Sequence, residues 1–281
     1  MTLILAATPL GNPGDASPRL KSAIENASII AAEDSRRFHR LCADIEVTFT
    51  ARVLSFFEGN EIDRTRELIS ELKSGATVLV VSDAGMPTIS DPGFRLMRDA
   101  IAEGIEVSVI PGPSAVTMSV ALSGLPTDRF SFEGFPPRTA GARLATFEKL
   151  RFEERTMVFF EAPHRIIASL TDAGSALGLD RNAAVCREMS KNYEEVVRGP
   201  ISELITWAKS KEILGEITVV IEGFDPSSRQ FSVEDLIKLV LAHEDAGESR
   251  KSAIALVAKE NSVSKRVVFD AMVTHKSEDK I

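Results

Sequence analysis

Short apolar runs alternate with amphipathic stretches along most of this chain, and no other feature constrains its fold as strongly. Strands that are apolar almost throughout, with helices between them, are typical of a mostly parallel sheet covered on both faces. The first half of the chain therefore predicts an α/β domain. Its expected strands are Leu3–Thr8, Ser28–Ala32, Val53–Phe57, Thr77–Ser82 and Glu106–Ile110, and its clearest expected helices are Glu61–Lys73 and Phe94–Glu103.

A second set of the same kind begins after the turn-rich residues Leu125–Asp128. The run Glu194–Arg198 fits one more short strand, paired antiparallel in a mixed sheet. Two α/β domains are therefore predicted, one over residues 1–128 and the other over residues 129–223. The strands expected in the second are Thr156–Glu161, Ala183–Glu188 and Glu216–Glu222, and its expected helices are Arg165–Leu177 and Ile201–Ser210.

The pattern breaks at the turn-rich stretch Gly223–Ser228, which predicts a linker. Three helical patterns follow it, over Val233–His243, Ser249–Lys259 and Ser262–His275. The last two are separated by a short turn, as in a helix-turn-helix. Residues 230–281 are therefore expected to form a small helical C-terminal module.

The composition excludes several classes of protein. The formal net charge is -8, so general binding to polyanions is disfavoured, and RNA binding must depend on local basic sites or on shape. Cys42 and Cys186 are the only cysteines, too few for a four-cysteine zinc site or a disulfide framework. The opening run Leu3–Ala7 is too short to span a bilayer and lacks the basic start of a signal peptide. We therefore expect a soluble, cytoplasmic protein.

Three turns rich in glycine or proline follow expected strands directly, at Thr8–Gly14, Ser82–Gly93 and Val109–Ala115. The carboxyl ends of parallel strands meet at one edge of a sheet, and open α/β sheets bind their ligands there, so these turns predict a small-molecule site. The first turn, taken alone, fits an ordinary strand–helix connection equally well. The second carries two aspartates, two glycines and two prolines, which is more than a structural turn needs.

Charged residues cluster at further strand ends, in Glu33–Arg37, Glu161–Arg165 and Arg187–Glu195. A carboxylate there can act as a base, and arginines can hold the phosphates of a nucleic acid backbone. Each cluster also has an ordinary structural explanation, since acidic groups complement a helix dipole and exposed ion pairs add little stability. We expect His164 to be structural rather than catalytic.

The most informative segments run in order along almost the whole chain. They are Ala7–Asn12, Ala32–Arg37, Ser82–Gly93, Pro111–Ala115, Ser123–Phe130, Glu133–Phe135, Glu161–Arg165 and Glu194–Gly199. Together they resemble the tetrapyrrole-methylase-like superfamily. Within it, the chain is similar to the branch whose members methylate the ribose 2′-oxygen of a cytidine in small-subunit (16S) ribosomal RNA. Glu33–Arg37, Glu161–Arg165 and Glu194–Gly199 distinguish this branch from the corrin-methylating one.

The resemblance implies two α/β domains of the tetrapyrrole methylase type, also called class III methyltransferases. The methyl donor S-adenosylmethionine would lie in the cleft between them, and the protein would be a homodimer. Met86 and Ser35 stand where the family usually has threonine, and Met86 weakens a side-chain role for that position. The donor-binding residues that the resemblance implies are Pro9, Asp83, Ala84, Gly85, Met86, Ile89, Ser114, Ala115, Glu161, Arg187, Gly215 and Glu216.

Methyl transfer from a sulfonium to a hydroxyl is an in-line displacement, so positioning supplies much of the rate. A protonated ribose hydroxyl is a poor nucleophile, and a nearby base should help it. Our hypothesis is that Asp34 or Glu33 accepts the hydroxyl proton, while Arg36, Arg37 and Arg165 hold flanking phosphates. This chemistry requires no metal. Two alternatives remain open: a methyltransferase acting on a corrin-type tetrapyrrole, and a noncatalytic RNA-binding assembly factor with the same fold.

Overall fold

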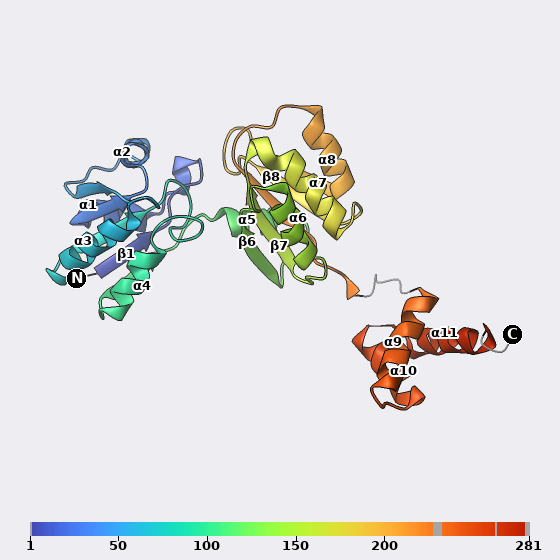
Figure 1. The fold of residues 1–281 in the computed structure, drawn as a ribbon. Coiled ribbons are helices and arrows are strands. Elements are labelled where there is room, and N and C mark those ends of the chain that lie inside the picture. The colour runs from blue at the N-terminus through green and yellow to red at the C-terminus, as the bar shows by residue number, and fades with distance from the viewer. Residues whose placement is uncertain (1, 227–231, 262, 279–281) are drawn as a thin grey trace. The chain divides into compact units, whose positions relative to one another are not determined.

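The computed structural model describes residues 2–226, 232–261 and 263–278, with side chains described as far as Val273. The chain divides into two compact units (Figure 1). One contains Met1–Arg151 and Arg155–Glu222 and holds two β-sheets, and the other contains Phe152–Glu154 and Gly223–Ile281. The predicted linker Gly223–Ser228 and the predicted helix Ser262–His275 both include residues that lie outside the described ones.

The first sheet is entirely parallel, with the strand order β3-β2-β4-β1-β5. The prediction of a mostly parallel sheet in the first half of the chain is therefore confirmed. The predicted strands ran slightly too far, since β1 stops two residues before Thr8. The strands are β1 (Thr2–Ala6), β2 (Ile29–Ala32), β3 (Arg52–Ser55), β4 (Thr77–Val81) and β5 (Glu106–Ile110).

Four helices cover the two faces of this sheet because alternate strand residues point to opposite sides. α1 (Pro18–Asn26) and α2 (Ser35–Asp44) bury side chains such as Leu20 and Phe38 against one face. α3 (Glu61–Lys73) and α4 (Phe94–Ala102) bury side chains such as Leu68 and Leu96 against the other. A short 3₁₀ turn, η1 (Pro13–Asp15), precedes α1.

The second sheet is mixed, with the order β6-β7-β10-β8-β9. β6 is parallel to β7, whereas β10 runs antiparallel to both β7 and β8, and β9 runs antiparallel to β8. The predicted antiparallel strand near Glu194–Arg198 is confirmed, and the edge strand β6 was missed. The strands are β6 (Phe130–Gly134), β7 (Thr156–Glu161), β8 (Asn182–Arg187), β9 (Glu195–Pro200) and β10 (Ile217–Ile221).

Helix α5 (Ala115–Ser123) connects the two sheets. It starts just after β5 of the first sheet, yet its buried Val116 and Val120 pack against Val158, Ala184 and Val220 of the second. The proposed domain boundary after residue 128 falls between α5 and β6. The opposite face of the second sheet is covered by α6 (Ala140–Lys149), α7 (Ile166–Leu177) and α8 (Ile201–Ser210), and the 3₁₀ turn η2 (Pro163–Arg165) precedes α7.

The second unit is helical, as expected, and contains α9 (Val233–Asp245), α10 (Arg250–Glu260) and α11 (Lys265–Glu278), drawn in orange and red in Figure 1. Its core includes Leu236 and Val257. The capping box of Ser232 and Asp235 fixes the start of α9: the Ser232 hydroxyl oxygen accepts the Asp235 backbone N–H, and the Asp235 carboxylate accepts the Ser232 backbone N–H. No helix in the described part of the chain is long and apolar enough to cross a membrane.

Candidate functional site

The turns that follow β1 and β4 are bonded to one another at the carboxyl edge of the first sheet. Thr8 and Gly85 exchange backbone hydrogen bonds of 2.9 and 3.0 Å, and the Thr8 hydroxyl donates to the Ser82 carbonyl at 3.2 Å. The turn after β5 joins them: a Cβ atom on Gly112 would lie 2.9 Å from the Cβ atom of Ala7, so only glycine fits there. The structure thus brings together the three turns that the sequence singled out.

A cavity of about 440 Å³ opens between this edge and the second sheet. Its volume lies within the range of about 300–1,000 Å³ that is usual for small-molecule sites. Five carboxyl groups and a single guanidinium, that of Arg37, are among its lining residues, so the cleft suits a cationic ligand. The lining residues are Leu10, Glu33, Arg37, Asp83, Ala84, Ser90, Asp91, Ala115, Phe135, Phe160, Glu161, Ala162, Pro163, Met189, Gly215, Glu216, Ile217 and Thr218.

Half of the residues that the sequence assigned to the donor line this cavity, and the others flank it. Asp83, Ala84, Ala115, Glu161, Gly215 and Glu216 line it. Pro9, Gly85, Met86, Ile89 and Ser114 belong to the same turns without lining the cavity. Arg187 is occupied elsewhere, because its guanidinium donates to the Glu195 carboxylate and to the Leu214 carbonyl, both at 3.1 Å.

The ends of β2 and β4 are joined by reciprocal hydrogen bonds between acidic residues. The backbone N–H of Asp34 donates to the Asp83 carboxylate, and the backbone N–H of Asp83 donates to the Glu33 carboxylate, both at 3.1 Å. Burial raises the pKa of Glu33 and that of Asp83. Arg37 partly offsets this negative charge, with its guanidinium 3.3 Å from the Asp83 carboxylate.

Asp34, a predicted base, is stabilised in its charged form, unlike Glu33 and Asp83. Its carboxylate caps the N-terminus of α2 by accepting the Arg36 backbone N–H at 2.8 Å, and it also accepts two hydrogen bonds from the Arg36 guanidinium. These bonds hold the pKa of Asp34 well below its ordinary value. A carboxylate that is stabilised in its charged form is a weak proton acceptor, which disfavours Asp34 as the base.

Asp91 lines the cavity and was not among the predicted site residues. Burial, with Glu33 nearby, raises the pKa of Asp91 to about 7. The loop that carries it contains two residues in the left-handed region, Thr88 at φ 76° and Ser90 at φ 64°. Such backbone strain in residues other than glycine is common at functional sites. The sequence offered one signal, since Asp91 lies in the loop that carries two aspartates.

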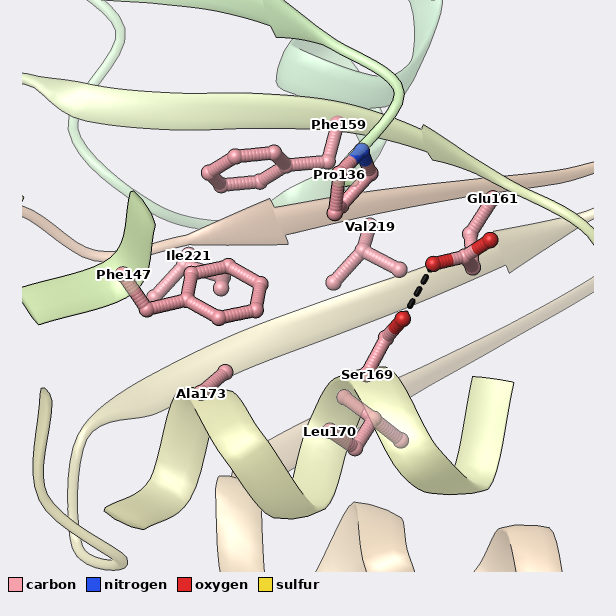
Figure 2. Close-up of a pocket in the computed structure, with 9 residues that line it drawn as sticks. All are labelled: Pro136, Phe147, Phe159, Glu161, Ser169, Leu170, Ala173, Val219 and Ile221. Carbon is pink, nitrogen blue, oxygen red and sulfur yellow. Dashed lines mark hydrogen bonds between the residues drawn. The ribbon is translucent and has the colours of Figure 1, made fainter. Parts of the chain in front are cut away.

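Glu161 ends β7 at the cavity wall and is 4% exposed. Its carboxylate accepts a hydrogen bond from the Ser169 hydroxyl and another from the Ala162 backbone N–H, and it pairs with the Arg165 guanidinium at 3.2 Å. Figure 2 shows it with Ser169 at the polar end of a small pocket whose other lining side chains, such as Phe147 and Val219, are apolar. Glu161 therefore has a fixed position between this pocket and the larger cavity.

Arg165, predicted to hold phosphates, lies within this wall. Its guanidinium donates to the backbone carbonyls of Pro136 and Pro137 and faces Glu161, and its side chain is 15% exposed. In contrast, the side chains of Arg36 and Arg37 are 89% and 64% exposed. Arg36 and Arg37, at the start of α2, are therefore better placed for a large polyanion than Arg165.

The turns before β9 and β10 complete the cavity from the second sheet. The Glu188 carboxylate accepts the backbone N–H of Glu216 at 2.9 Å, and Lys191 pairs with Glu188 at 2.9 Å and with Glu216 at 3.1 Å. Gly215 has φ 88°, and a Cβ atom there would lie 2.5 Å from Glu188 atoms. Lys191 also packs over Gly11 of the first turn, where a Cβ atom would lie 2.2 Å from its Cγ atom. These turns are thus packed against the first sheet's edge.

Several apolar residues of the cavity were not predicted, among them Leu10, Phe135, Phe160 and Met189. Phe135 is 54% exposed, which is unusual for an aromatic ring, and it contacts the Phe160 ring with centroids 5.6 Å apart. Sequence alone gives little signal for them, because apolar residues are ordinarily buried. Among the described residues, no group of three or more His, Cys, Asp or Glu side chains is arranged to hold a metal ion.

Residues 2–205 match the family model described as Tetrapyrrole (Corrin/Porphyrin) Methylases. A Mycobacterium bovis protein named Ribosomal RNA small subunit methyltransferase I is 47% identical over 98% of this chain and 96% of its own length. A protein of the same name from Halalkalibacterium halodurans is 37% identical over 96% of this chain and 93% of its own length.

A solved structure shares the fold. It is uroporphyrin-III C-methyltransferase from Thermus thermophilus complexed with S-adenyl homocysteine, with a TM-score of 0.52 and 15% identity over 78% of this chain and 96% of that one. The family resemblance drawn from the sequence is confirmed by the family model and the two relatives. The chain belongs to the tetrapyrrole (corrin/porphyrin) methylase family, in the branch of the relatives named ribosomal RNA small subunit methyltransferase I.

Proposed function

We propose that the chain is an S-adenosylmethionine-dependent methyltransferase that methylates the ribose 2′-oxygen of a cytidine in 16S ribosomal RNA. The observation that carries the proposal is the 47% identity, over 98% of the chain, to a relative named for methylation of small-subunit ribosomal RNA. A tetrapyrrole substrate is not favoured, because a structural neighbour named for uroporphyrin-III methylation is only 15% identical. A noncatalytic assembly factor is not favoured either, because the methyltransferase-like cleft is retained.

The cavity has the volume and charge that this donor requires. S-adenosylmethionine carries a positive sulfonium and a positive ammonium, and five carboxyl groups line the cleft. Opposite charges attract more strongly in a partly desolvated cleft than in water. When bound, the donor supplies an electrophilic methyl group. The chain's residues bind it, orient it and exclude water from the reacting atoms.

The proposed donor-binding residues come from both sheets. Ala84, Ala115 and Gly215 offer small side chains or none at the wall, which leaves room for a ligand to approach the backbone. Pro9, Gly85, Met86, Ile89 and Ser114 hold the turns in place, and Arg187 holds the Leu214 carbonyl beside Gly215. Asp83, Glu161 and Glu216 supply the negative charge.

The proposed RNA-binding groups are the exposed arginines at the start of α2. Arg36 is fixed by Asp34 and Arg37 by Asp83, so both guanidinium groups are held near the cleft while remaining exposed. Bidentate arginine contacts suit phosphate oxygens. Two locally exposed guanidinium groups are compatible with the net charge of -8, because the rest of the surface need not attract RNA. Arg165 would act indirectly, by fixing Glu161.

The proposed protein is a cytoplasmic homodimer. Support for the dimer comes from apolar residues exposed at the starts of α3 and α4: Phe57, Ile62 and Phe94 are 46%, 53% and 60% exposed. The Glu61 carboxylate accepts the Gly93 backbone N–H at 3.0 Å, which joins these two helix starts. Sedimentation analysis tests the dimer, and charged substitutions at Ile62 and Phe94 should give a monomer. The cytoplasm is proposed because ribosomal RNA is found there.

The direct test of the function is methyl transfer to small ribosomal subunits from cells that lack this protein. The full chain and tritiated S-adenosylmethionine should label 16S RNA, and mass mapping should locate the methyl group on the ribose of one cytidine. A methyl group on a nucleobase instead of a ribose would support methylation of 16S RNA but contradict the ribose 2′-oxygen as its target. No incorporation into subunits or into free RNA would contradict it.

A further inference from the structure

The carboxyl groups that line the cleft differ in how far their oxygens are already engaged. Glu161 pairs with Arg165 at 3.2 Å, Asp83 with Arg37 at 3.3 Å and Glu216 with Lys191 at 3.1 Å. In each of these pairs, a carboxylate oxygen is already engaged by a neighbouring cation. These groups are therefore suited to binding and positioning rather than to accepting a proton.

Two of the five, Glu33 and Asp91, form no ion pair with a lysine or arginine among the described residues. Glu33 accepts the Asp83 backbone N–H at 3.1 Å, which ties it to the connection between β2 and β4. Asp91 lies near the Ser82 hydroxyl, which donates to the Gly85 carbonyl at 3.2 Å, and no lysine or arginine among the described residues lies within ion-pair distance of Asp91. Of the five carboxyl groups, that of Asp91 therefore has the fewest hydrogen bonds and ion pairs with its neighbours.

The Asp91 loop is anchored at both ends. At its start, Gly85 is bonded to Thr8, and at its end the Glu61 carboxylate of α3 accepts the Gly93 backbone N–H at 3.0 Å. Between these anchors, Ser90 has φ 64°, a conformation that surrounding structure must maintain. A catalytic group needs such a fixed position, because small displacements of reacting groups cost large factors in rate.

On the basis of the proposed function, we propose that Asp91 is the catalytic residue that accepts the proton of the ribose 2′-hydroxyl. The 2′-oxygen forms its bond to the methyl carbon as the hydroxyl O–H bond breaks and the proton passes to the Asp91 carboxylate. The carbon–sulfur bond of the donor breaks, and its electron pair stays on sulfur as a neutral thioether. The proton is later released to water. Glu33 and Asp34 then serve the site by position and charge.

The surroundings of Asp91 suit this task at neutral pH. The groups that face it are Glu33 at the end of β2, Asp83 after β4 and Glu216 before β10, all acidic, with Arg37 of α2 beside Asp83. Burial and these negative neighbours raise the pKa of Asp91 to about 7. A base with a pKa near the working pH combines adequate basicity with an adequate fraction in the active form.

The first test is single-turnover methyl transfer to small subunits at saturating donor, measured across about pH 5 to pH 9. The wild-type rate should rise with pH and level off above the pKa of Asp91. Asp91→Asn should lower the rate by about 10²–10⁴-fold and abolish this rise, while calorimetry shows donor binding within about threefold of wild type. The matched control is Asp63→Asn on α3, whose side chain is 88% exposed, and it should match the wild type.

The second test does not depend on activity. A raised carboxyl pKa means that the folded state loses stability as pH rises from the unfolded pKa, about 3.9, through the folded one. Asp91→Asn removes this penalty, so its melting temperature relative to wild type should increase between about pH 4 and pH 8. Asp63→Asn should show no such trend. Asp91→Glu, which retains a base, should restore part of the rate.

Three results would overturn the assignment while leaving the proposed function intact. They are wild-type transfer by Asp91→Asn with an unchanged pH profile, loss of donor binding in that variant, and a melting difference that does not change with pH. If the wild-type protein itself transfers no methyl group, the proposed function fails, and the role of Asp91 fails with it.

Discussion

The two sheets of the α/β unit bring residues to the cleft in different ways. In the first, parallel sheet, β1, β2, β4 and β5 all end at the cleft, so each contributes the turn that follows it. In the second, mixed sheet, Ile217 at the start of β10 pairs with Glu161 at the end of β7 and with Arg187 at the end of β8. The residues that precede β10 therefore reach the same edge.

This difference limits the rule that ligands bind at the carboxyl ends of strands. In a parallel sheet, residues after strands locate the site. In a mixed sheet, residues that precede an antiparallel strand also lie at this edge. Gly215 and Glu216, which precede β10, line the cleft in this way. Substitutions on the two sides of the cleft separate the two contributions.

The largest effect is expected at Glu161, the buried carboxylate of the second sheet. Glu161→Ala leaves the Arg165 guanidinium and the Ser169 hydroxyl without their partner, and breaking a buried pair in this way costs about 3–5 kcal/mol of unfolding free energy. Denaturant unfolding measures this cost. Glu103→Ala, which breaks an exposed pair with Lys73, should cost about 1 kcal/mol or less. Equal costs would mean that Glu161 is not the fixed element of this wall.

At Gly215 we expect a smaller loss of stability than at Glu161, together with a loss of donor binding. A Cβ atom there meets the Glu188 side chain at 2.5 Å, so Gly215→Ala must displace either this side chain, which accepts the Glu216 backbone N–H, or the turn that lines the cleft. We expect donor affinity, measured by calorimetry, to fall at least tenfold, or about 1.4 kcal/mol. Gly104→Ala is the matched control, since Gly104 has φ 69° with nothing within 4 Å. It should lose stability and retain donor affinity; equal affinities would contradict a donor contact at Gly215.

The adjacent residues Glu33 and Asp34 should change stability in opposite directions. The pKa of Glu33 is raised, so its charged form destabilises the fold and Glu33→Gln should raise the melting temperature at pH 7. The pKa of Asp34 is lowered, so its charge stabilises the fold and Asp34→Asn should lower it. The Glu33 difference should disappear as pH falls through the raised pKa to the unfolded value of about 4.3, whereas the Asp34 difference should shrink only below about 4, where this carboxyl group becomes protonated in the unfolded chain. Changes of melting temperature in the same direction for the two variants would show that Glu33 and Asp34 do not have electrostatically different surroundings.

The smallest effect is expected from Arg36 on the first sheet's side. Arg36→Ala should weaken RNA binding a few-fold and lower the salt dependence of the affinity by about 0.7–0.9 in logarithmic slope, the value for one phosphate contact. Arg98→Ala on α4 removes an arginine that is likewise exposed and paired with an aspartate, and it should leave the slope unchanged. An unchanged slope for Arg36→Ala would remove this arginine from the RNA-binding surface.

Much of the first sheet and its turns could be predicted because the relevant signals are local. Apolar runs locate the strands, and the Ser82–Gly93 loop stands out by its composition. The state of each carboxyl group could not be predicted, since it depends on contacts between distant parts of the chain. Asp34 and Asp91 are both aspartates that follow strands, yet hydrogen bonds from Arg36 lower the pKa of Asp34, whereas burial raises the pKa of Asp91.

The second sheet was less predictable for a physical reason. β6 is an edge strand with partly exposed residues, so its apolar pattern is weak. The cavity-lining rings of Phe135 and Phe160 look like core residues in a sequence. Gly215 and Glu216 were assigned only through the family resemblance, because they precede their strand.

The most direct measurement of the central claim is a crystal structure of the full chain with S-adenosylmethionine at saturating concentration. The donor should lie in the cleft in contact with Asp83 and Ala84 from the first sheet and with Gly215 and Glu216 from the second. Donor density confined to one sheet, or an empty cleft at saturation, would contradict the account.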